Sequence, residues 1–235
     1  MTGYDPQRLH EALLRVRRTI SEACERAGRA PGEVRLVAVS KTHPVEAIAI
    51  LYELGVRDFG ESYVQELVDK VGRLPNDIRW HFIGGLQSNK ARFLGNEISL
   101  LHSVDRTSLI EALQRRSEQP MDILLQVNVA AEATKGGTSP DQLVALYDCA
   151  RSQSKLTVRG LMTMAPYCDD PESSRGHFRV LRALLDELRT HAGEGVASAL
   201  SELSMGMSDD FAVAIEEGAT LVRVGTALFG DRQSD

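Results

Sequence analysis

The hydrophobic and polar positions of the chain follow two patterns. The first stretch is amphipathic, with apolar residues three and four positions apart at Leu9, Leu13, Val16, Ile20 and Cys24. This spacing predicts a helix over about 7–28 that ends at Gly28. Farther along, short apolar runs predict strands at 36–39, 58–60, 80–83, 100–104, 123–129, 158–164, 203–207 and 221–229.

Stretches with helical periodicity lie between these runs, at 45–54, 61–71, 88–94, 106–118, 141–150, 172–191 and 211–217. Asp105 is the predicted N-cap of the helix over 106–118, and Ser208 with Asp209 and Asp210 that of the last helix. The alternation predicts an α/β fold, a single (β/α)8 TIM barrel over about 34–230 with an extra N-terminal helix. An open doubly wound sheet is the runner-up. No Gly/Ser/Pro-rich linker divides the chain, so we expect one domain over 1–235.

Composition narrows the class of protein. The 235 residues carry a formal charge of −6 and no basic run, which argues against nucleic acid and anionic membrane surfaces as partners. No apolar stretch approaches the roughly 18 residues of a membrane span, and the N-terminus has no signal-peptide core. Cys24, Cys149 and Cys168 are far apart, which indicates neither disulfides nor a metal site. We therefore expect a cytoplasmic protein.

Lys41 is the first candidate for chemistry. The chain has five lysines (Lys41, Lys70, Lys90, Lys135 and Lys155) among 27 basic residues, so this amine is not a product of a lysine-rich composition. It directly follows a predicted strand, where α/β proteins bind ligands, and a partly desolvated amine there can form a Schiff base with a carbonyl. The alternative is a surface lysine at the edge of a loop.

The segment 204–208, Ser-Met-Gly-Met-Ser, is the second candidate. Its hydroxyls and backbone amides follow strand seven, and Gly225 and Thr226 follow strand eight, the usual place of a phosphate site in barrels. The alternatives are that Ser208 only caps a helix and that Gly225 only forms a bulge. An amine facing a phosphate site predicts a phosphorylated aldehyde such as pyridoxal 5′-phosphate, with a phosphosugar still open.

Several motifs together resemble the pyridoxal phosphate homeostasis protein family, also called YggS-like or proline synthetase co-transcribed proteins. They are Val39-Ser-Lys41, Phe59-Gly-Glu-Ser-Tyr-Val-Gln-Glu66, Trp80-His-Phe-Ile-Gly84 with Leu86-Gln-Ser-Asn-Lys90, His102-Ser-Val-Asp105, Gly160-Leu-Met162, Leu203-Ser-Met-Gly-Met-Ser-Asp-Asp210 and Val222-Arg-Val-Gly-Thr-Ala-Leu-Phe-Gly230. The resemblance implies a fold-type III barrel that binds pyridoxal phosphate as a Schiff base and acts in vitamin B6 homeostasis, with effects on amino-acid metabolism.

Carried over by position, the resemblance assigns Lys41 as the cofactor lysine and Arg223 as the arginine facing the pyridine nitrogen. It assigns the phosphate to Ser204, Met205, Gly206, Gly225 and Thr226. Ser62 stands beside the ring where the family usually has Asn, and Gly85 stands where it usually has Pro. The loop at 134–137 also differs slightly from the usual form.

Arg223 bears on catalysis. A guanidinium stays charged and keeps the pyridine nitrogen unprotonated, which makes the cofactor a weaker electron sink. The alternative for Arg223 is an ion-paired strand arginine. Alanine racemases have a similar barrel and arginine but add a tyrosine from a C-terminal β-domain. The chain ends five residues after Gly230, so we expect that domain to be missing.

The favoured hypothesis is therefore a monomeric carrier with no catalytic residues, which delivers pyridoxal phosphate to apo enzymes. A weak amino-acid racemase and a Schiff-base aldolase are the alternatives. His81 and His102 are expected to be hydrogen-bonded core or rim residues. Lys90 and Lys135 are expected to be solvated loop residues, with a second anion site as the alternative.

Overall fold

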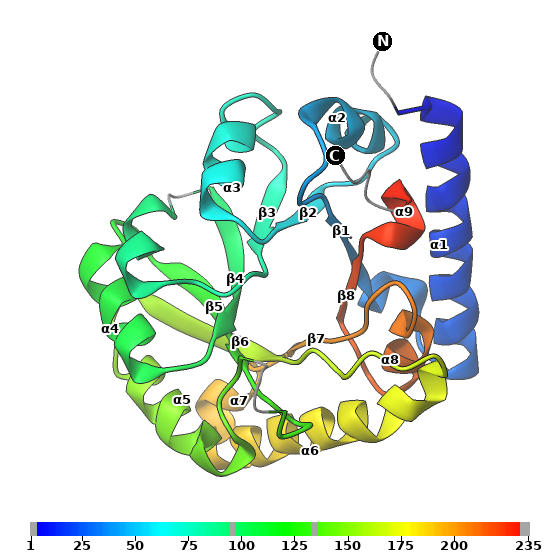
Figure 1. The fold of residues 1–235 in the computed structure, drawn as a ribbon. Helices are drawn as coiled ribbons and strands as arrows, with labels where there is room; N and C mark the ends of the chain where they lie inside the picture. The colour runs from blue at the N-terminus through cyan, green and yellow to red at the C-terminus, as the bar shows by residue number, and fades with distance from the viewer. Residues whose placement is uncertain (1–3, 95–96, 133–135, 231–235) are drawn as a thin grey trace.

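The computed structural model describes residues 4–94, 97–132 and 136–230 and shows a closed barrel of eight parallel strands (Figure 1). Each strand pairs with the next, and the last returns to the first, with Arg35 opposite Leu221. The predicted barrel is confirmed and the open sheet is wrong. The strands are β1 (Arg35–Val39), β2 (Asp58–Glu61), β3 (Arg79–Phe82), β4 (Ile98–Val104), β5 (Met121–Gln126), β6 (Leu156–Met162), β7 (Glu202–Ser204) and β8 (Leu221–Val224).

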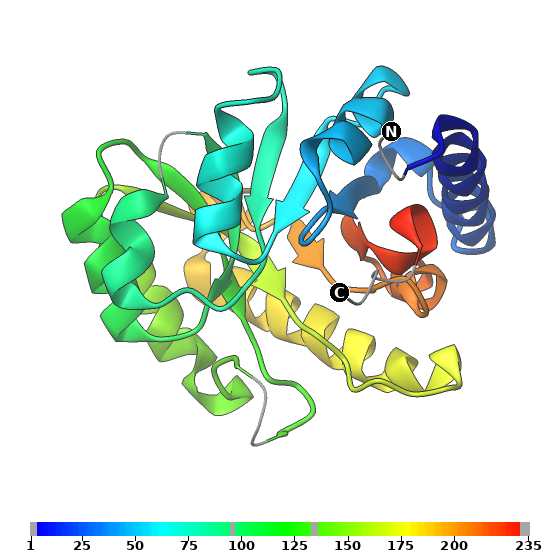
Figure 2. The ribbon, with the colours of Figure 1, turned by 45° about the horizontal axis from the view of Figure 1, so that its top comes forward.

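Helices form a ring around the strands (Figures 1 and 2). They are α1 (Pro6–Arg26), η1 (Pro31–Glu33), α2 (Val45–Glu53), α3 (Val64–Val71), η2 (Ser88–Phe93), α4 (Thr107–Arg116), η3 (Pro140–Gln142), α5 (Leu143–Arg151), η4 (Pro171–Ser174), α6 (Arg175–Ala192), α7 (Glu194–Ala197), α8 (Phe211–Glu216) and α9 (Thr226–Phe229), where η marks a 3-10 helix.

Three expectations need correction. The apolar run 221–229 was expected to be one strand, but the strand ends at Val224 and 226–229 form the short helix α9. The stretch 88–94 is a 3-10 helix, and the short α7 was not expected. Asp105 does not cap α4, because the N-cap position is Arg106 and Asp105 accepts a hydrogen bond from the Arg106 side chain. Apolar runs of four residues do not distinguish strand from helix by periodicity.

The N-terminal helix α1 covers the junction between the last strand and the first. It packs against α2, α8 and α9, and Figure 1 shows it running along that side of the barrel. α9 has four residues and cannot cover the junction alone. Leu9, Leu13 and Ile20 are buried residues of α1, and burial of each such side chain stabilises the fold by about 1.5–3 kcal/mol. The predicted stop is confirmed, since Gly28 follows α1 with φ +66°.

The interior of the barrel is partly apolar and partly polar. A small cluster fills one layer with Val37, Leu100, Leu124, Met162 and Leu221. Polar side chains from β2, β3, β4, β7 and β8 are buried beside it and bond to one another across the interior, namely Asp58, His81, His102, Ser204 and Arg223. The barrel is therefore a filled core with a polar axis.

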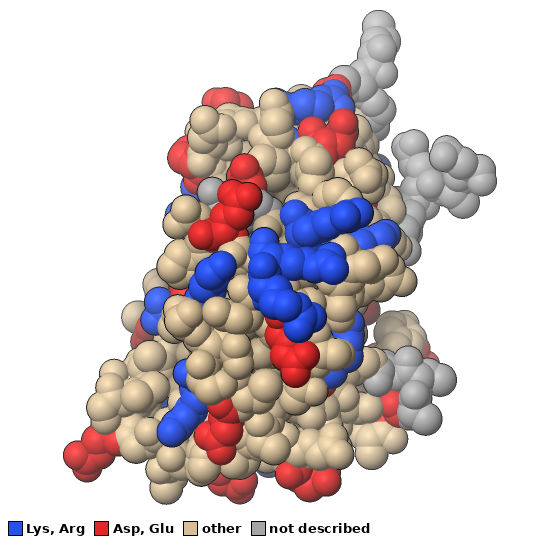
Figure 3. All heavy atoms as spheres, turned by 90° about the vertical axis from the view of Figure 1, so that its left-hand side faces the viewer, with Lys and Arg blue, Asp and Glu red and all other residues tan. Residues whose placement is uncertain are grey.

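The outer surface is not uniform in charge. Lys and Arg side chains gather on the side of the barrel that carries α4 (Figure 3). On that side Arg116 of α4 donates to the carbonyl of Asn89 in η2. The basic side chains of this surface come from separate stretches of the sequence, so the composition did not predict that they gather on one side. Among the described helices, none has the length and apolar character needed to cross a bilayer.

Candidate functional site

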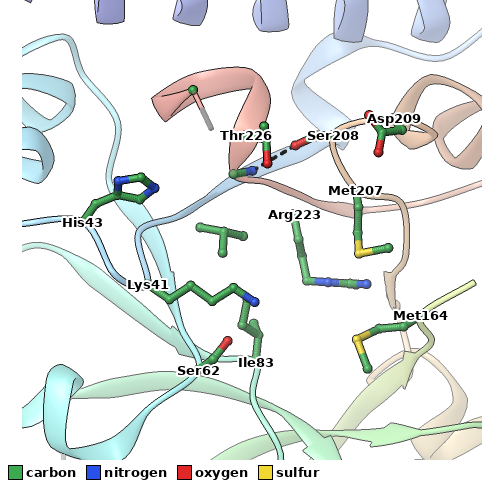
Figure 4. Close-up of a pocket in the computed structure, with 13 residues that line it drawn as sticks. Lys41, His43, Ser62, Ile83, Met164, Met207, Ser208, Asp209, Arg223 and Thr226 are labelled. Carbon is green, nitrogen blue, oxygen red and sulfur yellow. Dashed lines mark hydrogen bonds between the residues drawn. The ribbon is translucent and has the colours of Figure 1, made fainter. Parts of the chain in front are cut away.

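A cavity of about 220 Å³ opens at the carboxyl ends of the strands (Figure 4). Residues from both sides of the β8–β1 junction and from β2, β3, β6 and β7 meet there. The walls are formed by Val39, Lys41, His43, Ser62, Ile83, Met164, Met207, Ser208, Asp209, Arg223, Gly225, Thr226 and Gly230.

Lys41 enters this cavity from the end of β1. Figure 4 shows its side chain extending toward the space beside Ser62 and Arg223. The next residue, Thr42, has φ +66°, a conformation that a β-branched residue rarely adopts. The Thr42 amide donates to Oε1 of Glu66 at 2.6 Å, and this bond holds the turn that directs Lys41 inward.

A buried ionic cluster supports the Lys41 loop from behind. Lys70 Nζ donates to the Ser40 carbonyl at 2.8 Å, to Glu61 Oε1 at 2.8 Å and to Glu66 Oε1 at 2.6 Å. The Ser40 hydroxyl donates to the same Glu61 oxygen at 2.6 Å. Burial raises the pKa of Glu61, and Lys70 opposes that shift. No role was predicted for Lys70, although the small number of lysines in the chain was a signal.

Arg223 forms the floor of the cavity and is 3% exposed. It donates to Ser204 Oγ at 2.6 Å and to the Thr163 carbonyl at 2.8 Å. Burial lowers the pKa of Arg223 to about 10, against an opposing effect of Asp210, so the guanidinium is charged at neutral pH. Its hydrogen-bond partners among the described residues are a hydroxyl and a backbone carbonyl, and Asp210 acts on it as a nearby charge without a direct bond, which does not support the ion-paired alternative.

Ser208 connects the loops after β7 and β8. Its hydroxyl oxygen accepts from the amides of Gly225 and Ala227, both at 3.2 Å. These bonds occupy both lone pairs and leave the hydroxyl proton to be donated elsewhere. The N-cap position of α8 is Asp210, whose carboxylate accepts from the Met207 amide at 2.7 Å. The expected cap of Ser208, Asp209 and Asp210 is therefore confirmed for the position of Asp210 and wrong for Ser208, which joins the start of α9 instead.

The structure brings together five of the predicted site residues at the cavity, namely Lys41, Ser62, Arg223, Gly225 and Thr226. Ser62 reaches it because Gly84 allows close approach of two loops. A Cβ at Gly84 would lie 2.2 Å from the Ser62 carbonyl oxygen, so a side chain there is excluded. Gly85, by contrast, has open space around it.

The other three predicted residues lie behind the cavity wall. The Ser204 hydroxyl is bonded to Arg223 and to His102, and the Met205 amide donates to the Leu221 carbonyl at 3.2 Å. Gly206 has φ +87° and backs onto α8. Met207, Ser208 and Asp209 line the cavity instead of these three residues.

Some cavity residues were missed. His43 stacks on Phe229 with ring centroids 4.4 Å apart and is hydrogen-bonded to Tyr4. Its position two residues after Lys41 was the available signal. Lys90 is exposed and does not line the cavity, and Lys135 lies outside the described residues. Within the described ranges no cluster of His, Cys, Asp and Glu could hold a metal.

Comparison with known proteins finds relatives over almost the whole chain. The family described as alanine racemase, N-terminal domain, matches residues 13–233. A pyridoxal phosphate homeostasis protein of Aquifex aeolicus is 46% identical over 227 residues, which cover 95% of this chain and 98% of that protein.

Solved structures agree on the fold. PipY of Synechococcus elongatus PCC7942, solved with PLP bound, is similar with a TM-score of 0.79 and 36% identity, covering 94% of this chain and 100% of PipY. Alanine racemase of Corynebacterium glutamicum has a TM-score of 0.75 at 15% identity, and the similarity covers 99% of this chain but 63% of the racemase. At that identity the racemase shares the fold alone.

Proposed function

The chain belongs to the pyridoxal phosphate homeostasis protein family, and from this premise we propose that it binds pyridoxal 5′-phosphate at the barrel mouth and keeps the vitamin B6 pool balanced. The observation that carries the proposal is the convergence of an amine, a buried cation and a hydroxyl donor on one cavity. The structure of PipY with PLP bound supports the choice of ligand.

The residues present fit this ligand. Lys41 would hold the aldehyde carbon as a Schiff base, and Arg223 would face the ring nitrogen. Pyridoxal phosphate supplies an aldehyde that condenses with amines and a ring that withdraws electrons. Ser62 would lie near the ring edge.

The phosphate would be held by Ser208, Gly225 and Thr226. Ser208 has a proton to donate, because its lone pairs are occupied by backbone amides. Ser204 was a predicted ligand, but its hydroxyl is already bonded to Arg223 and His102. We therefore assign the hydroxyl contact to Ser208 and leave Met205 and Gly206 the role of shaping the loop.

The proposed role is that of a carrier and not of an efficient enzyme. Arg223 remains charged at neutral pH and would keep the ring nitrogen unprotonated. The His43 imidazole on the cavity wall is held by Tyr4 and Phe229, which restricts its use as a base. A monomeric cytoplasmic protein that passes its ligand to apo enzymes completes the proposal.

An absorption spectrum of the protein loaded with pyridoxal phosphate tests the ligand and the lysine together. We expect a visible band that borohydride removes, with the reduced label found on Lys41 by peptide mapping. Lys41→Ala should lose the band, whereas the control Lys155→Ala should keep it. A band that persists in Lys41→Ala would refute the assignment.

The carrier role is tested by comparing two rates. Transfer of pyridoxal phosphate to an apo enzyme should be measurable, while exchange of the α-proton of alanine in deuterated water should be slow. Turnover near the enzyme median of about 10 s⁻¹ would favour the racemase alternative instead.

A further inference from the structure

We propose that His102, His81 and Asp58 are positioning residues that fix the orientation of the Arg223 guanidinium through a one-way chain of hydrogen bonds along the barrel axis. The chain begins at the cavity and ends at the opposite mouth of the barrel. It deepens the proposed function, since it rests on Arg223 being the group that faces the ligand.

The chain is continuous in distance. Arg223 Nη1 lies 2.6 Å from Ser204 Oγ, and this oxygen lies 2.8 Å from His102 Nδ1. His102 Nε2 lies 2.9 Å from His81 Nδ1, and His81 Nε2 lies 3.0 Å from Asp58 Oδ1. Every interval is within ordinary hydrogen-bond length.

The two ends determine the direction of the chain. A guanidinium has protons to donate and no acceptor, so the Arg223–Ser204 bond runs toward Ser204. Ser204 can then donate its proton to Nδ1 of His102, whose Nε2 proton is given to His81.

Asp58 closes the chain. Although burial alone would raise its pKa, hydrogen bonds from His81 and Arg79 hold the pKa of Asp58 well below its usual value. The ionised carboxylate accepts from His81 Nε2 at 3.0 Å. It also accepts from Nε and Nη2 of Arg79 at 2.8 and 2.5 Å. All donors therefore point from a cation to an anion, an arrangement in which each bond strengthens the next.

Both histidines must be neutral for this direction to hold, with their protons on Nε2. They are buried at 1% and 0% exposure. Burial lowers the pKa of His81 against the opposing effect of Asp58, and burial and the nearby charge of Arg223 lower that of His102. Arg35 lowers both pKa values further, and Arg79 lowers that of His81. Asp122, Arg159 and Glu202 line the same far cavity as His81.

The far end of the chain reaches a second cavity of about 190 Å³, whose walls include His81, Arg79 and Asp122. Asp58 is bonded to Arg79, whose side chain is half exposed there. The orientation of a group at the ligand site is thus connected to solvent at the opposite end of the barrel.

Imidazole ¹⁵N NMR of the ligand-free protein tests the direction without use of bound cofactor. Both histidines should show the neutral Nε2–H signature and keep it from about pH 5.5 to about pH 8, where an ordinary histidine titrates. A proton on Nδ1 of His102, or a charged imidazole at neutral pH, would overturn the proposal even if no variant folds.

Asp58→Asn tests the coupling to Arg223. It should change the His102 signature and speed solvent exchange of the Arg223 guanidinium protons about tenfold, the factor that corresponds to about 1.4 kcal/mol. Asp122→Asn is the matched control, because Asp122 lies at the same mouth and pairs with Arg159 outside the chain. Equal effects of the two variants would show a general electrostatic influence and refute the chain.

A double variant separates the chain from other routes. Ser204→Ala removes the link next to Arg223, so adding Asp58→Asn should change Arg223 exchange no further. Additive effects would overturn the proposal. Failure of the loaded protein to show a visible band would refute the proposed ligand instead, and would leave these ligand-free measurements unaffected.

Discussion

Replacement of Lys70 by methionine is expected to destabilise the fold strongly. Lys70 is 4% exposed and donates to three oxygens, two of them carboxylate. The variant leaves Glu61, at 0% exposure, without its cation. Removal of one partner of a buried ion pair costs about 3–5 kcal/mol, which is more than the about 1.5–3 kcal/mol of one hydrogen bond to a charged group.

The loss should also depend on pH. Burial raises the pKa of Glu61 above its unfolded value, so the folded state binds more protons than the unfolded state in the interval between the two values. Stability therefore falls as pH rises through that interval, by up to about 1.4 kcal/mol per pH unit. Without Lys70 the interval extends upward, so the stability lost in Lys70→Met should grow as pH rises.

Urea unfolding followed by the fluorescence of Trp80, the one tryptophan of the chain, measures both effects. Lys155→Met is the control, because Lys155 is partly exposed and donates to one carbonyl, that of Ser117. It should cost about 1 kcal/mol. A loss below about 1 kcal/mol in Lys70→Met, or no change with pH, would refute the reasoning. Glu61→Gln added to Lys70→Met should abolish the pH dependence.

Other substitutions test the site and the core. Ser208→Ala should weaken pyridoxal phosphate binding about ten- to a hundredfold but leave pyridoxal, which lacks the phosphate, nearly unaffected in a competition titration; equal weakening would move the phosphate elsewhere. Gly84→Ala should lower the melting temperature and weaken binding, because its Cβ meets the Ser62 carbonyl, whereas Gly85→Ala should be neutral or slightly stabilising; similar results for both would contradict the close approach. Asp58→Asn should lose stability at neutral pH. Its difference from the wild type should shrink steadily as pH falls from about 4, near the pKa of an unfolded aspartate, toward the depressed pKa of Asp58 in the fold; a constant difference across an acid titration would disprove this.

Sequence patterns were sufficient for the barrel and for Lys41, because strand order and loop position are local properties. They did not predict which side chains after β7 face the cavity and which face the core. Ser204 and Ser208 both follow an apolar run, and the sequence does not tell which faces the core and which the cavity. That choice depends on where β7 ends, and it ends at Ser204.

The buried polar contacts along the barrel axis could not be predicted from the sequence, for a different reason. Asp58, His81, His102, Ser204 and Arg223 come from five strands, and their contacts follow from the stagger of the whole barrel. The sequence suggested only that the histidines were hydrogen-bonded core or rim residues, and the structure confirms the core. α9 was missed because its amides are held by Ser208, which lies 17 and 19 residues earlier.

The junction of β8 with β1 has a consequence for the folding of the newly synthesised chain. Lys41 lies just after the first strand and Arg223 lies in the last, so the cavity does not exist until the ribosome has released nearly the whole chain. Contacts between such distant segments form slowly, and a compound that bridges them favours the closed ring by mass action. A ligand that joins the first and last strands is therefore bound only by a finished barrel, and its binding makes the last closure step harder to reverse.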